Sequence, residues 1–363
     1  MSLSVFNKDN KSHLEAETPL HFGERLGIHD TINIRHQYIE DLFQYLKSID
    51  WNEKEVDLTR DKQQFESCPA TIRDIMIKNL AYQSELDSVA SRSAGVLIAP
   101  FITNSELWRC LVRIADNEVL HSATYTQIIR MCLQEPQEFF DEVYKNQAVL
   151  DRASKVIEVF DEIAKQSAEY TLTGVVTEKM KEAVVKYWVA MYCLERLEFM
   201  VSFSATFALA EQDYFLGIAT LVQKIMIDEF SVHKNLDKYV IKIVKSELKE
   251  TFDNLKPEIL QIVEDVRKSE YNWAEYLFSE GRSVVGLNEQ LSKKFVDFCS
   301  QDLYDDLGFE LPFERIEETP LPYMNKWLNI DGIQIANQET QNSNYMLNSW
   351  FDDTNEDFDF SIN

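Results

Sequence analysis

Hydrophobic residues recur three or four positions apart along most of this chain, a spacing typical of the buried face of an amphipathic α-helix. In the segment 31–48 the hydrophobic side chains fall on one such face, and Asp30 precedes it as a candidate N-cap. No alternating strand pattern recurs, although two β-branched patches at 95–102 and 171–176 are compatible with short extended connections. The spacing predicts helices over about 31–48, 67–90, 104–133, 137–168, 178–212, 217–246, 256–280 and 288–306.

The composition fits long helices better than a fold with many turns. Only nine glycines and eight prolines occur among 363 residues, so few positions interrupt a helix. With 45% hydrophobic residues the chain can bury a sizeable core, and a long helical bundle can hold most of it as one unit. We therefore predict an all-α protein with an irregular N-terminal segment at 1–30, a helical domain at 31–325 and a tail at 326–363.

Charge and cysteine content narrow the class of protein. A net charge of −26 argues against nucleic acids and anionic membranes as partners, because their phosphates repel an acidic surface. Five scattered cysteines without a CxxC motif are typical of reduced thiols rather than of disulfides or a zinc site. The start of the chain lacks an apolar signal core, and no run approaches the roughly 18–20 apolar residues that cross a bilayer. These features predict a soluble cytoplasmic protein.

Two histidines carry the most informative pattern. Of the six histidines only His121 and His233 lie beyond residue 36, and they follow Glu118 and Glu229 by three and four positions. Both offsets place the two side chains on the same helix face. Two Glu–His pairs, with one further carboxylate from each of two other helices, form the di-iron or di-manganese centre of ferritin-like bundles. The pairs therefore predict a ferritin-like bundle with a dinuclear metal centre.

The two remaining carboxylates are expected on other long helices. Asp87 stands among apolar and small neighbours in the segment 67–90, and Glu195 and Glu198 interrupt an otherwise apolar face in 178–212. A carboxylate in such surroundings is costly unless it is protonated, paired or bound to a metal. Four carboxylates carry a negative charge that two divalent cations balance. Oxygen ligands with one imidazole per metal favour iron or manganese over zinc.

The end of the chain differs in composition from the helical domain. Between Trp327 and Asn363 there is no lysine or arginine, whereas seven acidic residues accumulate among asparagine and glutamine. Such a segment does not fold alone, yet it retains Tyr345, Trp350 and Phe358. Aromatic residues along an acidic tail indicate a segment that binds a partner.

Several longer motifs resemble the small, radical-generating (β) subunit of class I ribonucleotide reductase. The resemblance runs from about Phe22 to the C-terminus, and it is specific because the motifs occur together. The matching residues are Trp51 with Glu55–Asp61, Leu86-Asp87-Ser88 with Arg92-Ser93, Glu118–Tyr125, Leu194-Glu195 with Phe199 and Phe203, Asp228-Glu229, and Trp273–Phe278.

The resemblance implies a homodimer in which each bundle holds two iron ions, with manganese as the alternative, and activates dioxygen. It also implies which of the acids are ligands. The implied ligands are Asp87, Glu118 and His121 for one metal and Glu195, Glu229 and His233 for the other.

The resemblance further assigns the storage of the radical. Tyr125, four residues beyond His121, matches the tyrosine that the oxidised metal pair converts to a stable radical. Phe199, Phe203 and Ile225 match its apolar pocket, which the chemistry needs because water or a thiol nearby would quench the radical.

A transfer route is implied as well. Trp51 and Asp228 match the relay to the subunit interface, with Asp228 holding the second nitrogen of His121. Tyr345 matches the tail residue that passes the radical to a separate large subunit, where ribonucleotides are reduced to deoxyribonucleotides. The terminal segment 358–362 resembles the end that docks on that subunit, so the resemblance implies one half of a ribonucleoside-diphosphate reductase.

Two features depart from the family pattern. In the family, the second pair has the spacing Glu-x-x-His, whereas this chain has Glu229-x-x-x-His233. A local π-bulge would restore the geometry of the pair. Glu198 stands one turn beyond Glu195, where it either competes as a ligand or pairs with Arg196 or with a partner outside the core.

Two other functions are compatible with parts of the pattern. One is a stand-alone di-metal carboxylate oxidase, which needs no aromatic tail for a radical to leave the protein. The other is a non-catalytic paralogue that stabilises an active partner, which predicts a lost ligand or a lost Tyr125. The presence of all these residues favours the radical-generating subunit.

Overall fold

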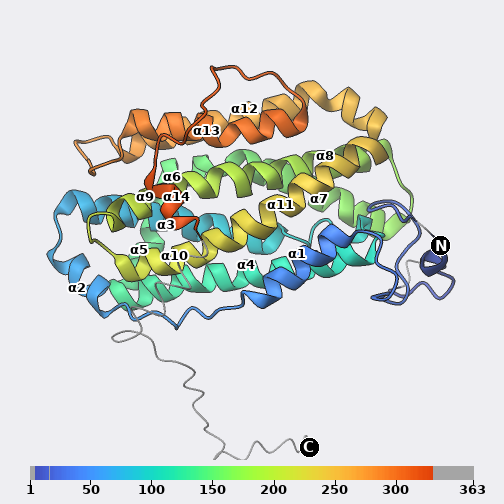
Figure 1. Cartoon of the computed structure of the whole chain (residues 1–363), viewed down its shortest axis with the longest axis horizontal. Helices are drawn as coiled ribbons and strands as arrows, with labels where there is room; N and C mark the ends of the chain where they lie inside the picture. Colours follow the sequence, from blue (N-terminus) through green and yellow to red (C-terminus); the bar gives the residue numbers. More distant parts are fainter. Residues whose placement is uncertain (1–4, 16, 330–363) are drawn as a thin grey trace, which may run out of the picture.

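The described part of the chain, residues 5–15 and 17–329 of a computed structural model, consists of helices joined by loops (Figure 1). It contains no β-strand, and its isolated bridges pair His21 with Ile102 and Val284 with Leu287. The all-α prediction is confirmed. The α-helices are α1 (Gln37–Ser48), α2 (Thr59–Ser67), α3 (Ala70–Ser93), α4 (Ser105–Cys132), α5 (Pro136–Lys145), α6 (Gln147–Arg152), α7 (Ser154–Thr173), α8 (Glu178–Cys193), α9 (Phe199–Ala210), α10 (Leu216–Asp228), α11 (Lys234–Glu247), α12 (Lys249–Leu277), α13 (Glu289–Leu307) and α14 (Tyr323–Trp327).

Some predicted helix boundaries differ from the structure. The first long helix begins at Gln37 rather than at 31, because Asp30 caps a turn and accepts hydrogen bonds from the backbone amides of Ile32 and Asn33. The predicted helix 137–168 is divided into α5, α6 and α7. Helix α2 was not predicted, since its nine residues bury only one hydrophobic side chain, that of Phe65.

The two β-branched patches are connections, as predicted, but they are not both extended. The first contains the 3₁₀ turn η2 (Ala99–Phe101), after which Ile102 pairs with the N-terminal segment. In the second, α7 continues to Thr173 and ends at Gly174, whose φ of 65° is the left-handed conformation that glycine adopts without strain.

Four helical rods surround the centre of the bundle. Two of them are α3 and α4, which pack along each other. Each of the other two rods consists of two α-helices joined without a loop by a π-helical turn. In one rod, η3 (Leu194–Glu198) joins α8 to α9, and in the other, η4 (Glu229–His233) joins α10 to α11. These two turns contact each other across the core. In Figure 1, α12 and α13 cover one side of the bundle and α1 lies along α4 on the opposite side.

The register of α10 is fixed at its first turn. Asp61 of α2 is buried and accepts hydrogen bonds from the backbone amides of Gly217 at 3.2 Å and Ile218 at 2.9 Å. The contact requires glycine at position 217, because a Cβ there would lie 2.6 Å from Oδ2 of Asp61. Since α10 runs without interruption to Asp228, this contact positions Asp228 and the following Glu229 along the bundle.

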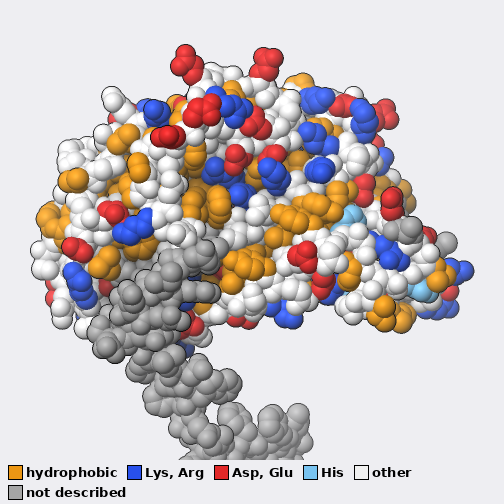
Figure 2. Space-filling view, in the orientation of Figure 1, with side chains coloured by type: hydrophobic (Ala, Val, Ile, Leu, Met, Phe, Trp, Pro, Cys, Tyr) orange, Lys and Arg blue, Asp and Glu red, His pale blue; other side chains and the backbone are white. Residues whose placement is uncertain are grey.

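The described chain ends beside α9. Trp327 of α14 stacks on Phe207 with 4.6 Å between the ring centroids, so the boundary predicted for the tail at 326 falls inside a packed helix. The remainder of the predicted tail, from 330 onward, lies outside the described residues. Figure 2 shows acidic and basic side chains interspersed over one face of the molecule. Among the described residues, no helix is long and apolar enough to cross a membrane.

Candidate metal centre

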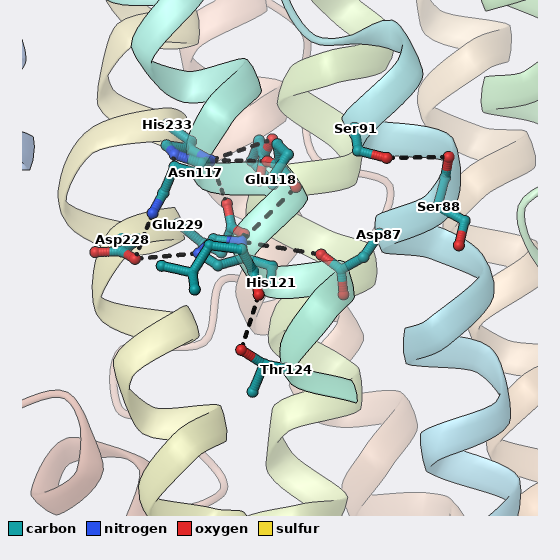
Figure 3. Close-up of polar contacts among 12 residues, drawn as sticks. Asp87, Ser88, Ser91, Asn117, Glu118, His121, Thr124, Asp228, Glu229 and His233 are labelled. Atoms are coloured by element: carbon teal, nitrogen blue, oxygen red, sulfur yellow. Dashed lines mark hydrogen bonds and ion pairs between the residues drawn. The ribbon is translucent and has the colours of Figure 1, made fainter. Parts of the chain in front are cut away.

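Six side chains from α3, α4, η3 and η4 meet at the centre of the bundle (Figure 3). Their potential ligand atoms form two groups, and within each group the atoms lie within 4.8 Å of one another. Glu118 and Glu229 belong to both groups, so they stand between two neighbouring positions. The first group is Asp87, Glu118, His121 and Glu229, and the second is Glu118, Glu195, Glu229 and His233.

A π-helical turn accommodates the unusual spacing of the second Glu–His pair. Residues Glu229–His233 form η4, in which the backbone hydrogen bonds span one residue more than in an α-helix. His233 Nδ1 lies 2.6 Å from Oε2 of Glu229 and 3.0 Å from Oε1 of Glu118. The extra residue is therefore absorbed by the backbone, and the ring of His233 faces the cluster. The second π turn, η3, which holds Glu195, was not predicted.

The inward-facing atoms of all six residues are buried, and they contact one another rather than protein groups outside the cluster. They are both carboxylate oxygens of each acid and the Nδ1 atom of each histidine, and Nδ1 of His121 and of His233 lie 2.8 and 2.6 Å from the oxygens of Glu229. Each such atom costs about 1–3 kcal/mol when buried without a partner, and more when it is charged. Two groups of oxygen and imidazole donors in this state are compatible with a dinuclear metal site, and the donor set suits iron or manganese.

Protons occupy the cluster when no cation is present. Burial, followed by the charges of neighbouring carboxylates, raises the pKa of Asp87 and of Glu195 well above their usual values. Burial alone lowers the pKa of His233, but the charge of Glu229 and its neighbours outweighs this effect and raises the pKa to about 10. The pKa of His121 is raised against burial by the same carboxylate. A cation that binds here must therefore displace protons.

A chain of short contacts leads from His121 to Trp51. Oδ2 of Asp228 lies 3.1 Å from Nε2 of His121 and accepts a 2.8 Å hydrogen bond from the indole Nε1 of Trp51. The indole also stacks on the imidazole of His121, with 6.0 Å between centroids and 18° between planes. The structure thus brings together these three predicted residues. Tyr345, the fourth residue of the predicted route, lies outside the described residues.

One residue of this network was not among the predicted site residues. Asn117 is buried, and its side chain lies between Asp228 and His233 (Figure 3). The signal in the sequence is its position, because Asn117 stands four residues before His121 and therefore shares the ligand face of α4. A polar amide on that face is a candidate for orienting a ligand.

Tyr125 lies one turn beyond His121 on α4 and is fully buried. Its hydroxyl makes no hydrogen bond with the protein, and burial, followed by the carboxylates of the cluster, raises its pKa well above the usual value. The predicted pocket residues Phe199, Phe203 and Ile225 are also fully buried, and the two phenyl rings stack with 5.8 Å between centroids. The phenol is therefore neutral and shielded from solvent.

Glu198 belongs to neither group of potential ligand atoms. Burial, followed by the charge of Glu270, raises the pKa of Glu198 well above its usual value, and the charge of Arg152 opposes this shift. Arg152 forms an ion pair with Glu270 and donates a 3.3 Å hydrogen bond to the backbone carbonyl of Glu198. The alternative pairing with Arg196 does not occur, because Arg196 contacts Asp302 at 2.7 Å.

The sequence is similar to those of known proteins. The sequence matches the family described as "Ribonucleotide reductase, small chain" over residues 29–320. It is 30% identical to the ribonucleoside-diphosphate reductase subunit beta of Buchnera aphidicola subsp. Schizaphis graminum, with 96% of each chain covered. It is 29% identical to the ribonucleoside-diphosphate reductase 1 subunit beta of Escherichia coli O157:H7, again with 96% of each chain covered.

The fold is similar to solved structures as well. The R2 subunit of ribonucleotide reductase from Clostridium botulinum superimposes with a TM-score of 0.76 at 18% identity, covering 91% of this chain and 99% of that one. Dimanganese(II)-NrdF from Streptococcus sanguinis gives a TM-score of 0.68 at 17% identity, covering 84% of this chain and 100% of that one. Since the family match covers most of the sequence, the chain belongs to the small-chain family of ribonucleotide reductase.

Proposed function

We propose that the cluster binds two iron ions and that the protein uses them to store an oxidising equivalent on Tyr125. The observation that carries the proposal is the pair of groups of buried ligand atoms, which have no hydrogen-bonding partner outside the cluster. Manganese is the alternative, because carboxylate oxygens and imidazole suit either metal. The proposed ligands are Asp87, Glu118 and His121 for one position and Glu195, Glu229 and His233 for the other, with Glu118 and Glu229 within reach of both.

When bound, the metal pair supplies the activation of dioxygen and the one-electron oxidation of Tyr125. The protein contributes the surroundings that let a radical persist. The phenol is fully buried and makes no hydrogen bond with the protein, and Phe199 and Phe203 are buried apolar residues of α9. Exclusion of water from such a site prevents side reactions of a reactive intermediate. These features support Tyr125 as the storage residue.

The contacts beyond His121 support a route out of the bundle. Asp228 joins His121 to Trp51 through contacts of 3.1 and 2.8 Å, and Trp51 is only partly buried. We propose that the oxidising equivalent leaves through Trp51 and continues through Tyr345 of the tail. Membership of the family implies pairing with a large subunit and formation of a dimer. We propose that the tail, ending in the segment 358–362, docks on that large subunit, where ribonucleotides are reduced.

The alternatives are less well supported. A non-catalytic paralogue predicts a missing ligand or tyrosine, whereas all six proposed ligands and Tyr125 are present. A stand-alone oxidase needs no connection from the metal site toward the surface, whereas Trp51, Asp228 and His121 form one.

The test is aerobic reconstitution of the metal-free protein with Fe(II), followed by metal analysis and electron paramagnetic resonance. We expect two irons per chain and a tyrosyl signal, which Tyr125→Phe abolishes without loss of iron. Tyr187→Phe is the matched control, because Tyr187 is another fully buried tyrosine of the core and donates its hydroxyl to the carbonyl of Ser93. A tyrosyl signal that persists in Tyr125→Phe, or fewer than two metals in the wild type with both iron and manganese, contradicts the proposal.

A further inference from the structure

Asn117 connects the two halves of the proposed centre. Its Nδ2 donates a 3.0 Å hydrogen bond to Oδ2 of Asp228, and its Oδ1 lies 3.0 Å from Nε2 of His233 (Figure 3). The side chain is only 2% exposed, so water does not compete for these contacts. Among the described residues, Asn117 is thus the one whose side chain contacts both His233 and Asp228, the residue that holds Nε2 of His121.

The orientation of the amide follows from the chemistry of its neighbours. A carboxylate accepts hydrogen bonds and does not donate them, so the NH₂ group of Asn117 must face Asp228. The carbonyl oxygen of Asn117 then faces His233 and can only accept. Nε2 of His233 must therefore carry the proton, which leaves Nδ1 free of a proton in the neutral ring. Nδ1 is the atom that faces the cluster, 2.6 Å from Oε2 of Glu229.

One oxygen of Asp228 accepts three hydrogen bonds. Its Oδ2 accepts them from Nε1 of Trp51 at 2.8 Å, Nδ2 of Asn117 at 3.0 Å and Nε2 of His121 at 3.1 Å. His121 is thereby oriented directly by Asp228. His233 is oriented by the same oxygen, but through the amide of Asn117. Partners of this kind fix the tautomer and ring direction of a metal-binding histidine.

We infer that Asn117 is a positioning residue for the second metal position and that it makes this position depend on Asp228. The inference rests on the proposed dinuclear centre. The first position has its own link to Asp228 through His121, so loss of the Asn117 amide affects the two positions unequally. Loss of a partner that orients a ligand typically weakens metal binding 10–100-fold. We expect that factor at the position of His233 and Glu195, and little change at the position of His121 and Asp87.

Asn117→Leu tests the inference, because leucine has the same branching and number of side-chain heavy atoms as asparagine but makes neither hydrogen bond. Asn79→Leu is the matched control. Asn79 is 1% exposed, and its amide also donates two hydrogen bonds, to the carbonyl of Ser202 at 3.0 Å and to Oγ1 of Thr206 at 2.9 Å. None of these atoms belongs to the cluster. Both variants lose a buried amide, so a purely structural effect lowers the melting temperature of both.

The measurement is titration of the metal-free full-length protein with Mn(II), in which free Mn(II) is followed by electron paramagnetic resonance. Anomalous diffraction at one Mn(II) per chain then identifies the weaker position. We expect Asn117→Leu to weaken only the position at His233, by 10–100-fold, and Asn79→Leu to leave both affinities unchanged. If Asn117→Leu does not fold, Asn117→Ser replaces it, because the shorter hydroxyl does not span the same gap, and the same selective loss is expected.

The outcomes separate the two proposals. Wild-type affinities at both positions in Asn117→Leu or Asn117→Ser overturn the inference and leave the dinuclear centre intact. Equal weakening of both positions, or the same selective loss in Asn79→Leu, also overturns it. Binding of fewer than two Mn(II) and fewer than two Fe(II) by the wild type overturns the proposed centre itself.

Discussion

Glu229 and His233 are four residues apart, yet Oε2 of the glutamate lies 2.6 Å from Nδ1 of the histidine because the backbone between them forms a π turn. A π turn is the conformation by which a helix takes up one additional residue without changing the phase of the turns on either side. The buried faces of α10 and α11 therefore stay aligned on both sides of η4, and both ligands point to the centre.

This relationship predicts that a deletion is tolerated at η4. Removing Ser231, which lies between the two ligands and is not buried, should convert the π turn into regular α-helix with the spacing Glu-x-x-His. Metal stoichiometry should remain at two per chain. Removing Lys242 from the regular part of α11 is the control, because it rotates the buried Val244 out of the core, at a cost of at least about 2 kcal/mol. Metal binding that is lost on deletion of Ser231 would show that the π turn itself is required.

Glu198 is predicted to be dispensable for metal binding. Burial raises the pKa of its carboxyl group, which favours the neutral form, and glutamine is a neutral side chain of the same size. Metal content should stay at wild-type level, and the stability should change by less than about 1 kcal/mol. Glu195→Gln, in the same π turn, should lose the metal at the second position. Loss of metal in Glu198→Gln and not in Glu195→Gln would reverse the ligand assignment.

The metal-free protein should become less stable as the pH rises above neutrality. The pKa of His233 is raised from its ordinary value of 6.5 to about 10, so between these pH values the folded state holds a proton that the unfolded state has lost. Stability therefore falls across this window, on the order of a few kcal/mol, and the raised pKa of His121 acts in the same direction. Thermal unfolding with chelator at pH 6.5, 8 and 9.5 measures the fall. His233→Gln should flatten it, and a stability that rises with pH would contradict the charge balance described for the cluster.

The contact between Trp51 and Asp228 should matter for radical transfer and not for radical formation. Trp51→Phe removes the 2.8 Å hydrogen bond to Asp228 but retains an aromatic ring beside His121. Two metals and the Tyr125 radical should form as in the wild type, while turnover with the large subunit should fall by at least about 100-fold, the scale for a misplaced catalytic group. Trp188→Phe is the control, because Trp188 donates a similar buried hydrogen bond to Nε2 of His21, away from the cluster. Turnover near wild type in Trp51→Phe would remove Trp51 from the route.

Tyr345 should act in the same route from the tail. Tyr345→Phe keeps the ring and loses the hydroxyl needed for proton-coupled oxidation, so binding to the large subunit should stay near wild type while turnover is lost. Truncation after Gln341 should remove both binding and turnover and leave the metal centre and the Tyr125 radical unchanged. Wild-type turnover of Tyr345→Phe would leave the tail with a docking role only.

The spacing of Glu118, His121, Glu229 and His233, with so few glycines and prolines, was enough to predict the all-α fold and the meeting of these four side chains in one buried cluster. Such features are local, because a helix brings residues three or four apart onto one face wherever it lies. The choice between Glu195 and Glu198 was not local, since both stand in an apolar stretch and the phase of that helix is altered by the unpredicted turn η3.

Asn117 is a second residue whose role could not be predicted from the sequence. Its identity and its place on α4 are visible in the sequence, but its two partners come from α10 and η4, more than a hundred residues away. The relative position of these elements is set by tertiary contacts such as that of Asp61 with the first turn of α10. Only the packed bundle decides that one carboxylate oxygen of Asp228 meets Trp51, His121 and Asn117 together, because the loop that holds Trp51, helix α4 and helix α10 are brought together by tertiary packing and not by any local hydrogen-bonding pattern.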